Sequence, residues 1–203
     1  YSVSHGKASA WLPVIELLRS YFEIADEDDD GRRSAKVETK VRALDPALAD
    51  TLPYILSLLG VAGAGASLAM MDARIRRRRT LDAVKRIIIR ESLKQPLVVI
   101  FEDLHWIDAE TQELLDLLVD SVASARILML VNYRPEYHHK WDNRTCYTQL
   151  RLDPLGTQSS DEMLRRQTLR MARSQSPAAF STAWRSRRNS EDSPSTTRLS
   201  CFC

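Results

Sequence analysis

Residues 97–133, LVVIFEDLHWIDAETQELLDLLVDSVASARILMLVNY, carry the clearest indication of fold class in the chain. It begins with five apolar residues at 97–101, a run typical of a strand buried on both faces of a parallel sheet. Asp108 can cap a helix that runs to Val122, and a second apolar run at 126–131 predicts another buried strand. Strand, helix and strand in this order form a right-handed βαβ crossover, so we expect parallel neighbours. The fold class is therefore α/β.

Charged side chains follow both predicted strands. Glu102 and Asp103 end the first strand, and Arg134 follows the second. Ligands bind at the carboxyl ends of the strands in an open parallel sheet. There, Glu102 and Asp103 could hold Mg²⁺, Asp103 could orient or deprotonate a water, and Arg134 could reach a γ-phosphate. Each residue alone also has a structural explanation, because acids after strands often serve as helix caps and an arginine before proline is often a surface residue.

Residues 97–137 resemble the Walker B to sensor region of STAND-type P-loop (AAA-like) ATPases. The most similar members are the predicted ATPases found with class III adenylate/guanylate cyclase domains. The blocks EDLHW, at 102–106, and YRPE, at 133–136, are the informative motifs, and the resemblance covers about residues 1–164. It implies a parallel-sheet P-loop NTPase-type core that acts as a regulatory, signal-transduction ATPase, with a cyclase domain and TPR-type repeats in the same parent protein.

The resemblance also implies roles for single residues. Glu102 corresponds to the first Walker B acid, the magnesium position, and Asp103 to the second acid, which orients the attacking water. Arg134 corresponds to the sensor arginine, so ATP and Mg²⁺ are the implied ligands. His105 and Trp106 belong to the family signature, with a role in packing and switch coupling. The family often has Asp where this chain has Glu102, whose longer side chain would change the metal geometry.

The phosphate-binding loop of such ATPases, G-x-x-x-x-G-K-[ST], does not occur in this sequence. Gly6-Lys7 is the only Gly-Lys pair, and Ala8 stands where the motif needs Ser or Thr. In the family this loop lies N-terminal to the matching stretch. We therefore expect a fragment that lacks the Walker A loop and binds ATP weakly or not at all by itself. The alternative is a non-catalytic interaction scaffold or the remnant of a decayed gene.

Composition divides the chain into two parts. Residues 1–155 form a partial P-loop ATPase domain, with the Walker B to sensor region at 96–136. Residues 156–203 hold eight Arg, ten Ser and few large apolar side chains. Such a segment buries too little apolar area to order itself, so we expect a mostly disordered tail. The sequence after about residue 164 is either a native divergent tail or an out-of-frame product.

Helical periodicity dominates the first half of the chain. We expect helices at 11–24, 34–44, 46–59 and 70–94, with a Gly/Ala-rich loop after Gly60. The run Arg76–Arg79 resembles a nucleic-acid or localisation patch, but on a helix its side chains fan around the axis, which favours a solvated face. The uncharged stretch 51–71 is too rich in Gly and Ala for a convincing membrane span.

The whole-chain composition excludes several classes of protein. Apolar residues make up 44% and charged residues 28%, close to the globular average, and the formal net charge is +2. A nucleic-acid partner is therefore unlikely, and no membrane is expected. Three cysteines do not make a disulfide framework, which favours the cytoplasm. Because a sheet without its central strand exposes apolar surface, we also expect poor solubility.

Overall fold

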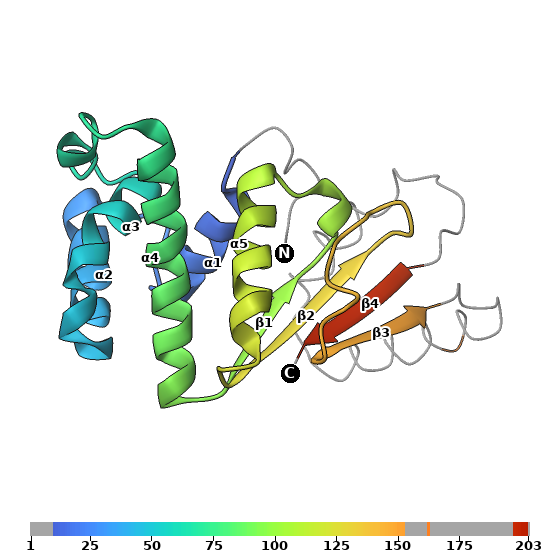
Figure 1. Ribbon diagram of the computed structural model, residues 1–203. Coiled ribbons are helices and arrows are strands. Elements are labelled where there is room, and N and C mark those ends of the chain that lie inside the picture. The colour runs from blue at the N-terminus through green and yellow to red at the C-terminus, as the bar shows by residue number, and fades with distance from the viewer. Residues whose placement is uncertain (1–9, 153–161, 163–196, 203) are drawn as a thin grey trace.

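The computed structural model describes residues 10–152, 162 and 197–202. Helices form the first half of this region, and the second half contains the strands together with one more helix (Figure 1). The helices are α1 (Leu12–Tyr21), α2 (Asp30–Leu44), α3 (Leu52–Leu58), α4 (Ala73–Lys94) and α5 (Ala109–Val122). Short 3₁₀ turns lie at Pro46–Thr51, Ala66–Leu68 and Leu104–Trp106.

Aspartates determine where most of these helices begin. The Asp29 carboxylate accepts a hydrogen bond from the Arg32 amide at the start of α2. Asp72 does the same at α4, where it accepts from the amides of Arg74 and Ile75. Each of these bonds satisfies a backbone donor that has no partner within the helix. The helices therefore begin where the sequence offers a cap, and α2 begins four residues earlier than predicted.

The region 46–59 differs from the single helix expected there. Pro46–Thr51 forms a 3₁₀ helix, and α3 then continues to Leu58. Gly60 follows with φ 75°, a left-handed conformation that glycine adopts without the steric strain of a side chain. The predicted loop after Gly60 is present, with one short 3₁₀ turn inside it.

The strands form one mixed sheet in the order β1-β2-β4-β3. Its members are β1 (Leu97–Phe101), β2 (Ile127–Tyr133), β3 (Tyr147–Leu152) and β4 (Thr197–Phe202). The predicted βαβ unit is confirmed, because β1 and β2 pair in parallel from Leu97 beside Ile127 to Phe101 beside Val131. Strand β4 is antiparallel to both of its neighbours, so β3 runs in the same direction as β2.

One expectation about the sheet needs correction. The first strand is not buried on both faces: Val99 and Phe101 are buried, but Val98 and Ile100 are 61% and 59% exposed. Val99 and Phe101 belong to the same core cluster as Leu114 and Leu118 of α5, which lies over this face of the sheet (Figure 1). Within the segment 156–203, which we expect to be mostly disordered, Thr197–Phe202 forms β4 by pairing with β2 and β3. Apart from Glu162, the rest of that segment lies outside the described residues, so the expectation stays a prediction.

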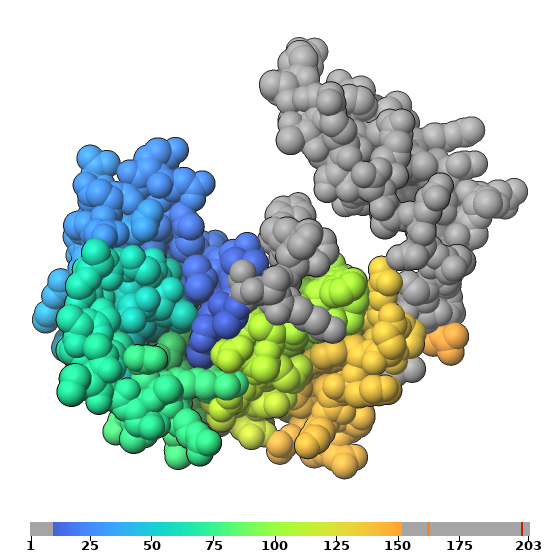
Figure 2. Space-filling view, turned by 90° about the horizontal axis from the view of Figure 1, so that it is seen from above, coloured from blue at the N-terminus to red at the C-terminus, as the bar shows by residue number. Residues whose placement is uncertain are grey.

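The core joins the helices to the sheet. Leu81, Val84 and Ile87 of α4 are buried, as are Leu114 and Leu118 of α5. They belong to one cluster that also includes Met129 and Val131 of β2 and Val14 and Leu18 of α1. From above, α1 lies between the α2–α4 helices and the sheet (Figure 2). Among the described residues, no helix is both long enough and apolar enough to cross a membrane.

Candidate functional site at the strand ends

The carboxyl end of β1 carries the two predicted acids. Both Glu102 and Asp103 are exposed, and neither side chain forms an ion pair with a described residue. The backbone of Asp103 has φ 56° and ψ 46°, the left-handed region that few residues other than glycine adopt. Aspartate is among the residues that tolerate this conformation. The chain therefore turns sharply at Asp103, directly after the strand.

Asn132 holds this turn from the neighbouring strand. Its side-chain oxygen, Oδ1, accepts a hydrogen bond of 2.6 Å from the backbone amide of Asp103. The parallel register explains the contact, because Phe101 lies beside Val131 and the next residues of the two strands follow at the same edge. This hydrogen bond confirms the prediction that the ends of the two strands lie close together. A left-handed residue at a strand end, fixed from a second strand, is typical of a functional site.

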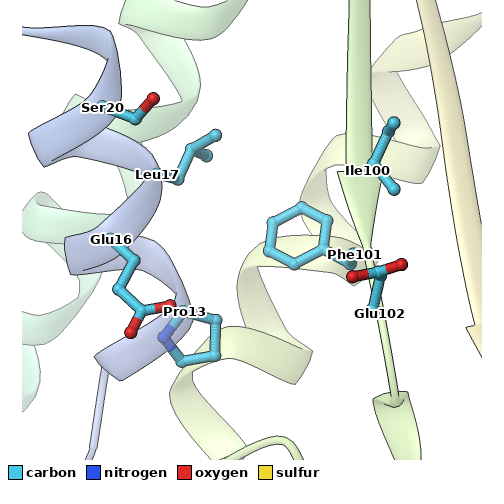
Figure 3. Close-up of a pocket in the computed structure, with 7 residues that line it drawn as sticks. All are labelled: Pro13, Glu16, Leu17, Ser20, Ile100, Phe101 and Glu102. Atoms are coloured by element: carbon cyan, nitrogen blue, oxygen red, sulfur yellow. The ribbon is translucent and has the colours of Figure 1, made fainter. Parts of the chain in front are cut away.

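Glu102 lies at a pocket between β1 and α1 (Figure 3). The pocket has a volume of about 390 Å³ and is lined on the α1 side by Pro13, Glu16, Leu17 and Ser20. Glu16 and Glu102 belong to opposite walls, so two carboxylates line one opening (Figure 3). Ile100 and Phe101 complete the β1 wall. Glu102 is therefore accessible to a ligand from this side of the sheet.

The residues after Asp103 form a compact turn that leads into α5. Leu104 is buried, and the rings of His105 and Trp106 lie 5.3 Å apart. Asp108 then caps α5: its carboxylate accepts from the Thr111 amide at 2.9 Å and from the Thr111 hydroxyl at 2.7 Å. The turn is thus anchored by the core on one side and by a helix cap on the other. The packing role expected for His105 and Trp106 is not tested by these contacts.

Arg134 begins the loop after β2. It is partly buried, and no ion pair joins its guanidinium to Glu102, Asp103 or any other described residue. Its carbonyl accepts a hydrogen bond from the Tyr137 amide at 3.0 Å, which closes the first turn of the loop. The fold therefore brings the acids and Arg134 to one edge of the sheet without joining their side chains.

A network of aromatic and polar side chains fixes this loop. The Tyr133 hydroxyl lies 2.8 Å from Nε2 of His139 and 3.0 Å from the Tyr147 hydroxyl. Trp141 stacks on His139 at 4.7 Å and donates from Nε1 to Asp116 of α5 at 2.8 Å. Burial raises the pKa of Tyr147 above its ordinary value, so this phenol stays protonated. The loop that carries Arg134 is thus held by β2, β3 and α5 together.

The oxygen donors at the β1 tip fit a magnesium ion that is held mainly by phosphates and water. Mg²⁺ typically takes one or two carboxylates from such a protein site and completes its shell with water and substrate oxygens. Glu102 and Asp103 supply that number. Within the described residues, no group of three or more His, Cys, Asp or Glu side chains could form an all-protein metal site.

The sequence missed two parts of this site. Asn132 was not selected as a site residue, because its role depends on the register between β1 and β2. The aromatic network around Tyr133 and His139 was also missed, since it joins residues from β2, from the following loop and from β3. A signal for the first existed: a polar residue at the end of an apolar strand, one position before the predicted site edge.

Comparisons with known proteins give the family. The model of the AAA ATPase domain family matches residues 3–131, well over half of the chain, and the matched range includes Glu102 and Asp103 but ends before Arg134. An uncharacterized protein of Rhizobium meliloti (strain 1021) is 32% identical over 118 residues, which are 58% of this chain and 11% of that relative. The chain thus spans about a tenth of that relative's length, and no solved structure matches. The chain belongs to the AAA ATPase domain family.

Proposed function

We propose that this chain is part of an ATP-binding and ATP-hydrolysing module of a signal-transduction protein, with its nucleotide site at the carboxyl ends of β1 and β2. The AAA ATPase family generally uses ATP and Mg²⁺. The observation that carries the proposal is the β1 tip. Glu102 and the left-handed Asp103 form no ion pair with a described residue, and Asn132 of the next strand holds the Asp103 backbone.

The residues would divide the chemistry as follows. Glu102 and Asp103 would hold Mg²⁺, which when bound offsets the negative charge of the phosphates. The Asp103 carboxylate would accept a hydrogen bond from the attacking water and orient it. The Arg134 guanidinium would donate hydrogen bonds to phosphate oxygens as their charge increases during transfer. Asn132 would keep Asp103 in position through the backbone.

The missing phosphate loop limits what the 203 residues do alone. The backbone amides and lysine of G-x-x-x-x-G-K-[ST] supply most contacts to the phosphates, and this sequence has no such motif. We therefore propose that the 203-residue chain binds ATP weakly and does not turn it over. We also propose that the same protein contains a cyclase domain or TPR-type repeats. This rests on the resemblance of residues 97–137 to the ATPases found with class III cyclase domains.

The first test is the sequence of the gene on both sides of this coding region. The proposal expects an in-frame G-x-x-x-x-G-K-[ST] upstream. A stop codon directly before Tyr1 would contradict an ATPase role and would favour an interaction scaffold or a remnant.

The second test is Mg²⁺-dependent ATP hydrolysis by the complete gene product. Arg134→Ala should lower turnover about 100-fold, the usual effect of removing one donor to developing charge. Arg144→Ala is the matched control, because Arg144 pairs with Asp120 on the surface. Equal activity of the two variants would contradict the role of Arg134.

A further inference from the structure

A second pocket lies among the helices, apart from the strand ends. It has a volume of about 390 Å³, lies between α1, α3 and α4, and has no lining residue in common with the pocket at Glu102. Its lining includes Trp11, directly before α1, and Ile15 of α1. Tyr54 of α3 and Arg76 and Arg77 of α4 also line it. Its volume lies in the range of small-molecule sites, about 300–1,000 Å³.

The walls of this pocket combine aromatic rings with positive charge. Trp11, Ile15 and Tyr54 are partly buried, so their apolar surfaces are available to a ligand without being fully solvated. Trp and Tyr rings accept a flat ring by stacking or by edge contact. None of the described lining residues carries a carboxylate. The pocket therefore suits an aromatic ligand that is anionic.

The arginines at this pocket differ in their partners. Arg77 is fixed by α5: its guanidinium contacts Glu110 at 3.4 Å and Glu113 at 2.8 Å. Arg76 forms no ion pair with any described residue, and the same holds for Arg74, Arg78 and Arg79 of the same helix.

Farther along α4 the pattern changes, because Arg86 pairs with Asp50 and Arg90 with Asp45. The unpaired cations are thus concentrated in the first turns of α4, and Arg76 is the one among them that lines the pocket. A guanidinium without a carboxylate partner is well suited to bind a phosphate or a carboxylate through two parallel hydrogen bonds.

We propose that the pocket between α1, α3 and α4 binds a small ligand in which an aromatic ring carries an anionic group. Arg76 binds the anion, and Trp11 and Tyr54 hold the ring. A phosphate and a carboxylate both meet this description, and the test separates them.

The test is a titration of the 203-residue chain with phenyl phosphate, followed by calorimetry and by tryptophan fluorescence. Saturable binding is expected, and phenol or inorganic phosphate alone should bind at least about tenfold more weakly, since each lacks one of the two contacts. Benzoate is the second anionic probe, and the tighter of the two anionic probes identifies the preferred group. No saturable binding of either would overturn the proposal. Equal binding of inorganic phosphate would overturn the role of the ring.

Two substitutions in α4 place the binding site. Arg76→Gln should weaken phenyl phosphate binding about tenfold, because it removes the charged donor at the pocket. Arg78→Gln removes the same charge from an exposed position outside the pocket and should leave binding within about twofold. Trp11→Phe should remove most of the fluorescence change while binding by calorimetry remains. Equal weakening by Arg76→Gln and Arg78→Gln, or no weakening by Arg76→Gln, would overturn the site. Unchanged circular dichroism spectra of all three variants exclude unfolding as the cause.

Discussion

Two acidic runs in this chain look alike in sequence and differ in almost every contact. The run at 26–30 ends in the first residue of α2, and Glu102-Asp103 precedes the turn that leads to α5. In the first, Asp26 pairs with Arg19, Asp28 pairs with Lys36, and Asp29 caps α2. In the second, neither carboxylate forms an ion pair with a described residue.

The difference shows what separates a structural acid from a candidate ligand-binding acid. Consecutive carboxylates repel one another, and the first run offsets this with cations and backbone amides of its own fold. The second run has exposed carboxylates, and among the described residues its fixed point is the Asp103 backbone amide, which donates to Asn132. We therefore infer that the first run contributes to stability, and we propose nucleotide chemistry for the second.

The largest expected effect separates the two runs by activity. In the complete gene product, Asp103→Asn should lower ATP turnover about 10²–10⁴-fold, because the amide cannot accept the proton of the attacking water. Asp28→Asn makes the same chemical change in the other run and should leave turnover within about twofold. Steady-state hydrolysis at saturating Mg-ATP measures both. Similar losses in the two variants would mean that Asp103 has no special role in turnover.

The second effect concerns the hydrogen bond by which Asn132 holds the Asp103 backbone, here called the backbone clamp. Asn132→Ala removes the acceptor for the Asp103 amide, so the left-handed turn is less firmly held. We expect turnover to fall about tenfold, the size of one lost hydrogen bond. Asn143→Ala, in an exposed part of the following loop, is the control. If Asn132→Ala has full activity, the clamp does not position Asp103.

The third effect is on stability and its pH dependence. The hydrogen bond from Lys36, with that from the Ala25 amide, holds the pKa of Asp28 below its ordinary value. A lowered folded-state pKa stabilises the protein above the unfolded pKa of about 4, and this contribution is lost as the pH falls through the folded-state value. Asp28→Asn should therefore lower the melting temperature at pH 7, and the difference from the wild type should shrink on acidification below pH 4. A difference that stays constant down to pH 2 would argue against this linkage.

The smallest effect is expected at the edge of the same run. Asp26 is 92% exposed, and its ion pair with Arg19 is open to solvent. Exposed pairs of this kind contribute little. Asp26→Asn should leave the melting temperature at pH 7 unchanged within error, in contrast to Asp28→Asn. If Asp26→Asn lowers the melting temperature as much as Asp28→Asn does, the contribution of each acid to stability does not depend on its hydrogen-bond and ion-pair partners.

The βαβ unit could be predicted because each of its signals is local. The apolar runs gave β1 and β2, and Asp108 marked the start of α5. The crossover rule then placed the two strand ends at one edge, which the hydrogen bond between Asn132 and Asp103 confirms. The paired acids were found for the same reason, since they directly follow an apolar strand.

What could not be predicted depends on contacts between distant residues. The exposure of Val98 and Ile100 depends on what covers that face of the sheet, which a strand pattern does not report. Strand β4 depends on pairing with β2 and β3, far away in sequence. The left-handed conformation of Asp103 has no composition signal, because the residue there is an aspartate and not the glycine that usually marks this conformation.

The most direct test of the central claim is whether a metal–nucleotide complex binds at the β1 tip. Mn²⁺ can replace Mg²⁺ and be followed by electron paramagnetic resonance in the presence of ATP, with the complete gene product as wild type, Glu102→Gln and Asp28→Asn. We expect one ATP-dependent Mn²⁺ site per chain in the wild type and in Asp28→Asn, and its loss in Glu102→Gln. The same site with unchanged affinity in Glu102→Gln would contradict it.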